Sequence, residues 1–103
     1  MNAKDEFTEH IDNRAVKCAL IEKVTGFCTP ASSSPLREGY SSEEYASFLD
    51  SIDFPYDNGF GSQKLFGIIW YNDGTWSERG EYDGSEWWAH KTSPEIPSVL
   101  RRE

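Results

Sequence analysis

Apolar and aromatic residues gather in the C-terminal half of the chain, in three short segments separated by turn signals. The segments 64–71, 75–82 and 86–91 are rich in Trp, Tyr, Ile and Phe, with Asp-Gly pairs at 73–74 and 83–84 between them. Asp-Gly readily adopts the positive φ angles that a two-residue type I′ hairpin turn requires. The pattern therefore predicts a three-stranded antiparallel meander, which contains all four tryptophans of the chain.

Two-residue turns also predict the register of the meander. Tyr71 is expected opposite Trp76, and Arg79 opposite Trp88. Side chains alternate along a strand, so one face, the better core, collects Leu65, Ile69, Tyr71, Trp76, Tyr82, Trp87 and Ala89. Gly80 leaves room there for the Trp87 ring to lie across the central strand. The other face is mixed and is expected to be partly wet or covered; it collects Phe66, Ile68, Trp70, Arg79, Glu81, Trp88 and His90.

One amphipathic helix is predicted before the meander, over residues 42–52. Ser41 is placed as its N-cap, and Glu44 three residues later completes a capping box. Tyr40 and Tyr45 are spaced as a hydrophobic staple. The apolar residues that follow at i, i+3, i+4 and i+7 form a single stripe; they are Tyr45, Phe48, Leu49 and Ile52. Such a stripe must lie on the meander, although the pattern leaves open which face it covers.

The N-terminal part of the chain is predicted to add one strand, at about 15–24, with Val16, Cys18 and Leu20 on one face. Whether this strand pairs with the first or the last strand of the meander is not evident from the pattern. Residues 1–13 are polar, and they form either a short frayed helix or a mobile tail.

Loops and a tail complete the predicted organisation. The stretches 29–39 and 53–63 are rich in Ser, Pro and Gly, and the prolines of 92–103 predict an extended tail. The predicted fold is therefore α+β: a three-stranded antiparallel meander plus an N-terminal strand, packed against one amphipathic helix. The whole chain of 103 residues makes a single small domain.

Charge and cysteine content narrow the classes of function. Eighteen acidic and ten basic residues give a net charge of −8, which disfavours direct binding to nucleic acid or to an anionic membrane. Cys18 and Cys28 are too few for a disulfide scaffold and lack the spacing of metal ligands. No signal peptide is visible. These features predict a cytoplasmic protein without a metal or other cofactor.

Paired carboxylates near a base are what a small hydrolase requires. Glu78, Glu81 and His90 are close together in the predicted meander, and Glu78 is expected opposite apolar Ile69. A carboxylate on an apolar face can act as a general acid. The simpler interpretation, which we favour, is that Glu78 reaches solvent or a partner such as Lys91.

Two surfaces are candidates for binding instead. The first is aromatic: Trp70 and Trp88 with Arg79 between them could stack on a sugar, a nucleotide or a partner's side chain, although Arg79 over Trp88 could equally be an internal cation–π contact. The second is acidic and lies on the helix and the following loop. There the acids would steer a basic protein partner, and two aromatic side chains would anchor it; the residues are Glu43, Asp50, Asp53, Tyr56, Asp57 and Phe60.

The string DGTWSERGEYDGSEWWAHKTSPEIP, at residues 73–97, resembles a pattern in small acidic accessory proteins of phages and prophages. Such proteins commonly bind host proteins, including nucleases and defence complexes. The resemblance covers the C-terminal part of the chain and assigns no site residue. It implies a non-enzymatic module that acts in the host cytoplasm by binding or inhibiting a protein, such as a nucleic-acid-binding or defence protein. A small-ligand binder and a small hydrolase are the alternatives.

Overall fold

The computed structural model describes residues 2–24, 32–56, 64–82 and 85–93. They form two helices and a five-stranded antiparallel sheet with the strand order β2-β1-β3-β4-β5. In chain order the elements are α1 (Ala3–Ile11), β1 (Val16–Lys23), β2 (Ser32–Leu36), α2 (Ser42–Ser51), β3 (Leu65–Tyr71), β4 (Trp76–Tyr82) and β5 (Ser85–Lys91). The predicted α+β class is confirmed, and the predicted N-terminal strand pairs with β3, the first strand of the meander.

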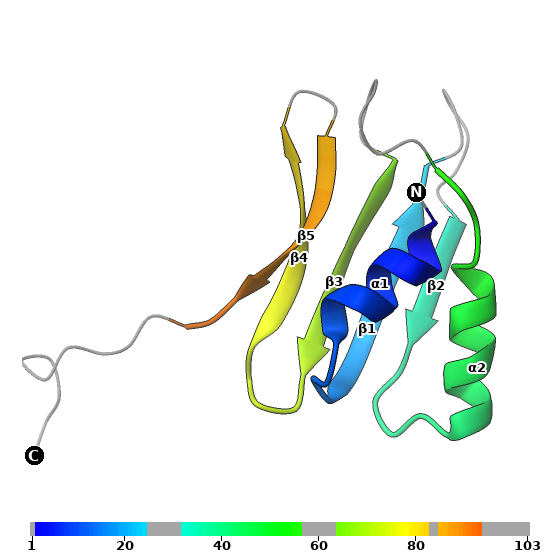
Figure 1. The fold of residues 1–103 in the computed structure, drawn as a ribbon. Coiled ribbons are helices and arrows are strands. Elements are labelled where there is room, and N and C mark those ends of the chain that lie inside the picture. Colours follow the sequence, from blue (N-terminus) through cyan, green and yellow to red (C-terminus); the bar gives the residue numbers. More distant parts are fainter. Residues whose placement is uncertain (1, 25–31, 57–63, 83–84, 94–103) are drawn as a thin grey trace, which may run out of the picture.

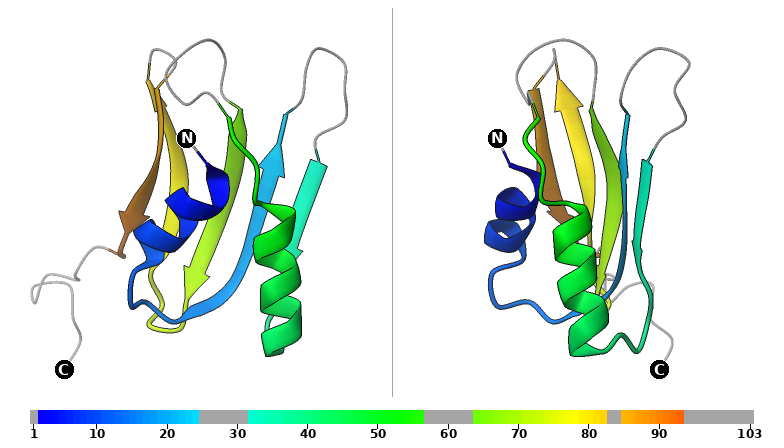
Figure 2. Two further views of the ribbon diagram at one scale, coloured as in Figure 1. Left: turned by 45° about the vertical axis from the view of Figure 1, so that its right-hand side comes forward. Right: turned by 90° about the vertical axis from the view of Figure 1, so that its right-hand side faces the viewer.

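Both helices lie on the same side of the sheet (Figures 1 and 2). The hydrophobic core fills the space between the helices and the sheet, and Phe7 of α1 and Phe48 of α2 meet there edge to face, with ring centroids 5.4 Å apart. We call this side of the sheet the inner face. The opposite side, called the open face, carries no helix among the described residues.

The hairpin between β3 and β4 differs from the predicted one by a single residue. Tyr71 N–H donates to the Thr75 carbonyl at 3.0 Å, so three residues, not two, form the loop. Gly74 closes it with φ +88°, as in a type I turn followed by a left-handed residue. Trp76 consequently pairs with Trp70 and not with Tyr71.

This one-residue shift moves every side chain of β4 and β5 to the other face relative to β3. The second hairpin has the predicted register, since Arg79 pairs with Trp88 and Gly80 with Trp87. The prediction of which residues share a face is therefore wrong between β3 and the other two strands, although it is correct between β4 and β5. Trp88 is buried on the inner face, whereas Trp87 is 42% exposed on the open face. The Trp87 ring does lie over Gly80, as predicted.

Helix α2 begins as its sequence predicts. Glu44 N–H donates to the Ser41 side chain at 3.1 Å, and Ser41 N–H donates to the Glu44 carboxylate at 3.2 Å, which completes the capping box. The rings of Tyr40 and Tyr45 stack across the cap with centroids 5.6 Å apart. Along the predicted stripe Phe48 and Ile52 are fully inside the core.

We expect Ser41→Ala to lower the free energy of unfolding by about 1 kcal/mol, because it leaves the Glu44 N–H without its acceptor. Ser42→Ala is the matched control, since Ser42 is exposed in the first turn of the same helix. Urea denaturation of both variants measures the difference. Equal midpoints would show that the cap contributes nothing to stability.

The N-terminal segment and the first strand can both be compared with their predictions. Residues 3–11 form helix α1, and Phe7 and Ile11 are buried, so the helical alternative is correct and the helix is packed, not frayed. Strand β1 forms as predicted, but Val16, Cys18 and Leu20 do not share one face. The register of β1 shifts between Val16 and Cys18, so Val16 lies in the core with Ala19 and Ile21.

Strand β2 was not predicted, because its sequence SSSPL falls inside the expected loop 29–39. It pairs antiparallel with β1 at the sheet edge. Pro35 is tolerated there because an edge strand needs only one of its two rows of hydrogen bonds. The predicted tail beyond residue 93 and most of the predicted loop 53–63 lie outside the described residues.

Candidate functional site

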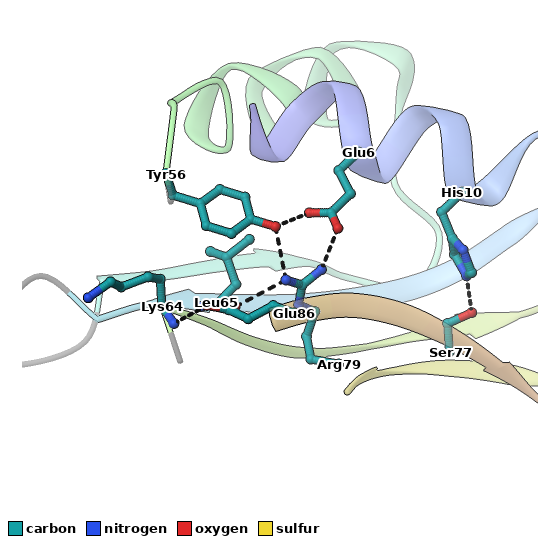
Figure 3. Close-up of polar contacts among 8 residues, drawn as sticks. All are labelled: Glu6, His10, Tyr56, Lys64, Leu65, Ser77, Arg79 and Glu86. Carbon is teal, nitrogen blue, oxygen red and sulfur yellow. Dashed lines mark hydrogen bonds and ion pairs between the residues drawn. The ribbon is translucent and has the colours of Figure 1, made fainter. Parts of the chain in front are cut away.

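The inner face contains a cluster of charged side chains between α1 and the sheet (Figure 3). Arg79 of β4 lies at its centre, with a side chain only 2% exposed. Arg79 Nη1 is 3.1 Å from Glu6 Oε2 of α1, and Arg79 Nη2 is 3.1 Å from Glu86 Oε1 of β5. The guanidinium carbon lies 5.0 Å from the centroid of the Trp88 ring. Arg79 therefore joins one helix and two strands.

Glu86 has a fully buried side chain, and it is satisfied by donors from three residues. Besides Arg79, the backbone N–H groups of Lys64 and Leu65 donate to its carboxylate at 2.6 Å and 3.0 Å. These two amides lie where β3 begins. Glu86 thus fixes the start of β3 against β5, two strands that are not neighbours in the sheet.

Tyr56 completes the cluster from the segment after α2. Its hydroxyl donates to Glu6 and accepts from Arg79 Nη2 at 2.9 Å. Burial, and then the hydrogen bond to Glu6, raise the pKa of Tyr56, so the phenol stays protonated as the donor. Burial by itself lowers the pKa of Arg79, but Glu6, Tyr56 and Glu86 more than offset it and the net shift is upward.

A second polar contact joins α1 to the sheet beside this cluster. His10 Nε2 lies 2.7 Å from Ser77 Oγ, and Tyr71 Oη lies 2.8 Å from the same oxygen. The His10 ring stacks on Trp88 with centroids 6.2 Å apart. Burial, and then Arg14, lower the pKa of His10, which favours the neutral imidazole.

A serine and a histidine in contact invite comparison with a nucleophile and its base. Ser77, however, has no exposed surface, so a substrate carbonyl could not approach its oxygen. The polar groups of the inner face instead bind one another, and what they do is hold α1 and Tyr56 on the sheet. Sequence reasoning missed Glu6, His10 and Ser77 because the contacts that join α1 to the sheet and to Tyr56 link residues 50 or more positions apart along the chain.

The residues of the hydrolase hypothesis do not come together. Glu78 lies on the open face, whereas Glu81 and His90 belong to the inner face of the same two strands. Glu78 accepts from Trp76 Nε1 at 2.8 Å and pairs with Lys91 at 3.6 Å. The interpretation that Glu78 reaches Lys91 is therefore confirmed. His90 Nε2 instead contacts Thr75 Oγ1 at 2.9 Å.

The residues of the predicted acidic surface lie in different environments. Glu43 and Asp50 are exposed on α2, as predicted. Asp53 accepts from Asn2 Nδ2 at 3.0 Å and so fastens the start of α1. Tyr56 is not free to anchor a partner, because its hydroxyl is held in the inner cluster. The remaining two residues, Asp57 and Phe60, lie outside the described part of the chain.

The aromatic hypothesis placed Trp70, Arg79 and Trp88 on one face, which is wrong. Arg79 and Trp88 face each other inside the protein, as the cation–π alternative proposed. Trp70 lies on the open face, where it pairs with Trp76. The cause is the extra residue in the first hairpin.

The open face is aromatic and apolar over three adjacent rows of paired residues. Its first row contains Cys18, Trp70, Trp76 and Lys91; its second Leu20, Ile68, Glu78 and Ala89; and its third, in the same alternation, Glu22, Phe66, Gly80 and Trp87. Three of its large rings are 40–42% exposed, those of Phe66, Trp70 and Trp87. Large exposed apolar side chains gathered on one face and bordered by charged residues are typical of interaction sites in soluble proteins.

Comparison with known proteins found no matching family model, no matching curated protein and no matching solved structure. In the part of the chain that the structure describes, neither helix is long and apolar enough to cross a membrane. Among the same residues, no three or more His, Cys, Asp or Glu side chains are grouped so that they could hold a metal ion.

Proposed function

We propose that this protein is a non-enzymatic binding module whose contact surface is the open face of the sheet, and that its partner is a protein with a basic surface. The observation that supports this best is the exposure of Phe66, Trp70 and Trp87 on the face opposite both helices of the described part of the chain (Figure 2). Tryptophan is enriched among the residues that dominate protein interfaces.

The negative charge of the chain indicates what kind of protein would bind the open face. The chain has a net charge of −8, and in the three described rows of the open face Glu22 and Glu78 outnumber Lys91. A second copy of the chain would bring like charges together on the same surface, which costs free energy. A partner with exposed arginine and lysine would be attracted, and its cations could make cation–π contacts with the indole rings.

The proposal departs in one respect from the surface expected from the sequence. The helix acids Glu43 and Asp50 are exposed, but the aromatic anchor Tyr56 beside them is engaged inside the protein. Affinity at an interface comes mainly from buried aromatic anchors, whereas exposed rim charges chiefly affect the rate of association. The helix acids are therefore assigned to steering and the open face to the contact.

The test compares two variants as baits in bacterial lysate, the host that the resemblance to phage proteins implies. Trp70→Ala removes a ring from the open face, and Glu43→Lys with Asp50→Lys reverses the charge of the helix. We expect a protein that the parent retains, that Trp70→Ala binds at least about 30-fold more weakly, and that the helix variant still binds with a slower association.

Circular dichroism of both variants checks that the fold is intact. Retention should also weaken with added salt, because exposed charges are screened beyond about 10 Å at 0.1 M ionic strength. The proposal is overturned if no protein distinguishes the parent from Trp70→Ala. It is also overturned if only the helix variant loses binding, or if the parent forms a stable dimer through this face.

A further inference from the structure

The most specific chemistry on the open face lies around Glu78, in the middle of β4. Trp76 and Gly80 are its neighbours on this face of the strand, two residues to either side. Trp76 Nε1 donates to Glu78 Oε1 at 2.8 Å, which holds the first indole beside the carboxylate. The Trp87 ring covers Gly80, because its atoms come within 2.6–2.9 Å of where a Cβ would stand. An indole ring therefore lies on each side of one carboxylate.

The carboxylate already has a cationic neighbour. Lys91 Nζ is 3.6 Å from Glu78 Oε2, and the two side chains are 51% and 42% exposed. Ion pairs as exposed as this one contribute little, from nothing to about 1 kcal/mol. An incoming cation that makes better contacts can therefore displace Lys91 from Glu78 at small cost.

We propose that Trp76, Glu78 and Trp87 form a subsite for an arginine side chain of the protein partner. Guanidinium is planar and weakly hydrated, so it can stack on an indole ring while its N–H groups donate to a carboxylate. Ammonium is more strongly hydrated and cannot stack in this way. The inference rests on the proposed function, and it names the side chain that the open face recognises.

The subsite can be tested without knowing the partner. The probe is the peptide acetyl-Gly-Arg-Gly-amide, and the readout is the indole N–H signals in ¹⁵N spectra, assigned with single Trp→Phe variants. We expect the signals of Trp76 and Trp87 to move saturably at millimolar peptide, and that of buried Trp88 to stay in place. The same peptide with citrulline, which is isosteric and uncharged, should cause no shift, and the lysine peptide should bind more weakly.

Two variants test whether Glu78 recognises the arginine peptide or only pairs with Lys91. Glu78→Gln should weaken binding of the arginine peptide by about tenfold or more, since it removes a charge-assisted hydrogen bond. Lys91→Met should tighten binding by up to about fivefold, because it removes the competing cation. An unchanged Trp88 signal in each variant shows that the fold is intact.

The inference is overturned if the arginine peptide causes no saturable shift, if the citrulline or lysine peptide binds equally well, or if Glu78→Gln binds as the parent does. If a protein from the lysate nevertheless binds the parent and not Trp70→Ala, the proposed function holds and only the arginine subsite is rejected. Conversely, peptide binding with no partner that depends on Trp70 would remove the proposed function and leave an arginine-binding surface.

Discussion

Replacing Arg79 with methionine is expected to lower the free energy of unfolding by about 3–5 kcal/mol. Methionine retains much of the aliphatic stem under Trp88, so little of the loss comes from an empty cavity. The loss arises because the carboxylates of Glu6 and Glu86 remain inside the protein without their cation. Urea denaturation followed by far-UV circular dichroism measures the change.

The matched control is Lys17→Met, which breaks an ion pair of similar length on the surface. Lys17 Nζ lies 3.3 Å from Glu38 Oε1, and both side chains are more than half exposed. Its loss should cost less than about 1 kcal/mol, because water solvates both charges. If the two variants lose equal stability, the Arg79 cluster does not hold α1 on the sheet as described.

Trp88→Ala and Trp87→Ala should differ sharply, although the two residues are adjacent in sequence. Trp88 is 7% exposed and contacts both Arg79 and His10, so its removal should cost about 3–5 kcal/mol. Trp87 lies on the open face over Gly80, and its removal should cost about 1 kcal/mol or less. The measurement is urea denaturation by circular dichroism, since both changes alter tryptophan fluorescence directly.

This pair also tests the register of the first hairpin. A two-residue turn would place Trp87 in the core with Ile69 and Tyr71, and then Trp87→Ala would be the more damaging change. The reverse order of the two losses would therefore contradict the three-residue loop closed by Gly74. It would also remove Trp87 from the proposed binding surface.

The two faces of the sheet differ in how their charged and aromatic side chains are engaged. The inner face uses its charged residues to fasten α1 and Tyr56 to the strands, with partners inside the same chain. The open face exposes its rings and keeps Glu78 accessible. The polar side chains of the inner face thus stabilise the fold, and the proposed contact surface is the side of the sheet that neither helix covers.

Local signals in the sequence were sufficient for the elements they govern. The capping box and apolar stripe predicted α2 because both depend on contacts within one helical turn or two. The three segments with Asp-Gly between them predicted β3, β4 and β5. The pairing of Gly80 with Trp87 followed from the two-residue turn predicted at 83–84. The exposure of Glu43 and the contact of Glu78 with Lys91 were also anticipated.

Contacts between distant segments decided the rest. Strand β2 has no strand pattern of its own and forms because the edge of β1 supplies hydrogen-bond partners. The buried cluster needs Glu6, Tyr56 and Arg79 to meet across more than 70 residues, which no local pattern indicates.

By itself, the sequence determined the class of fold, the capped helix and the meander, because propensity, capping and turn chemistry act over a few neighbouring residues. Only the tertiary structure decided which tryptophans are buried and which are exposed on the open face. The side-chain period of a strand is two residues, so one additional residue in the loop at Gly74 exchanged the faces of β4 and β5. That exchange placed Arg79 and Trp88 in the interior and left Trp70, Trp76 and Trp87 together on the open face.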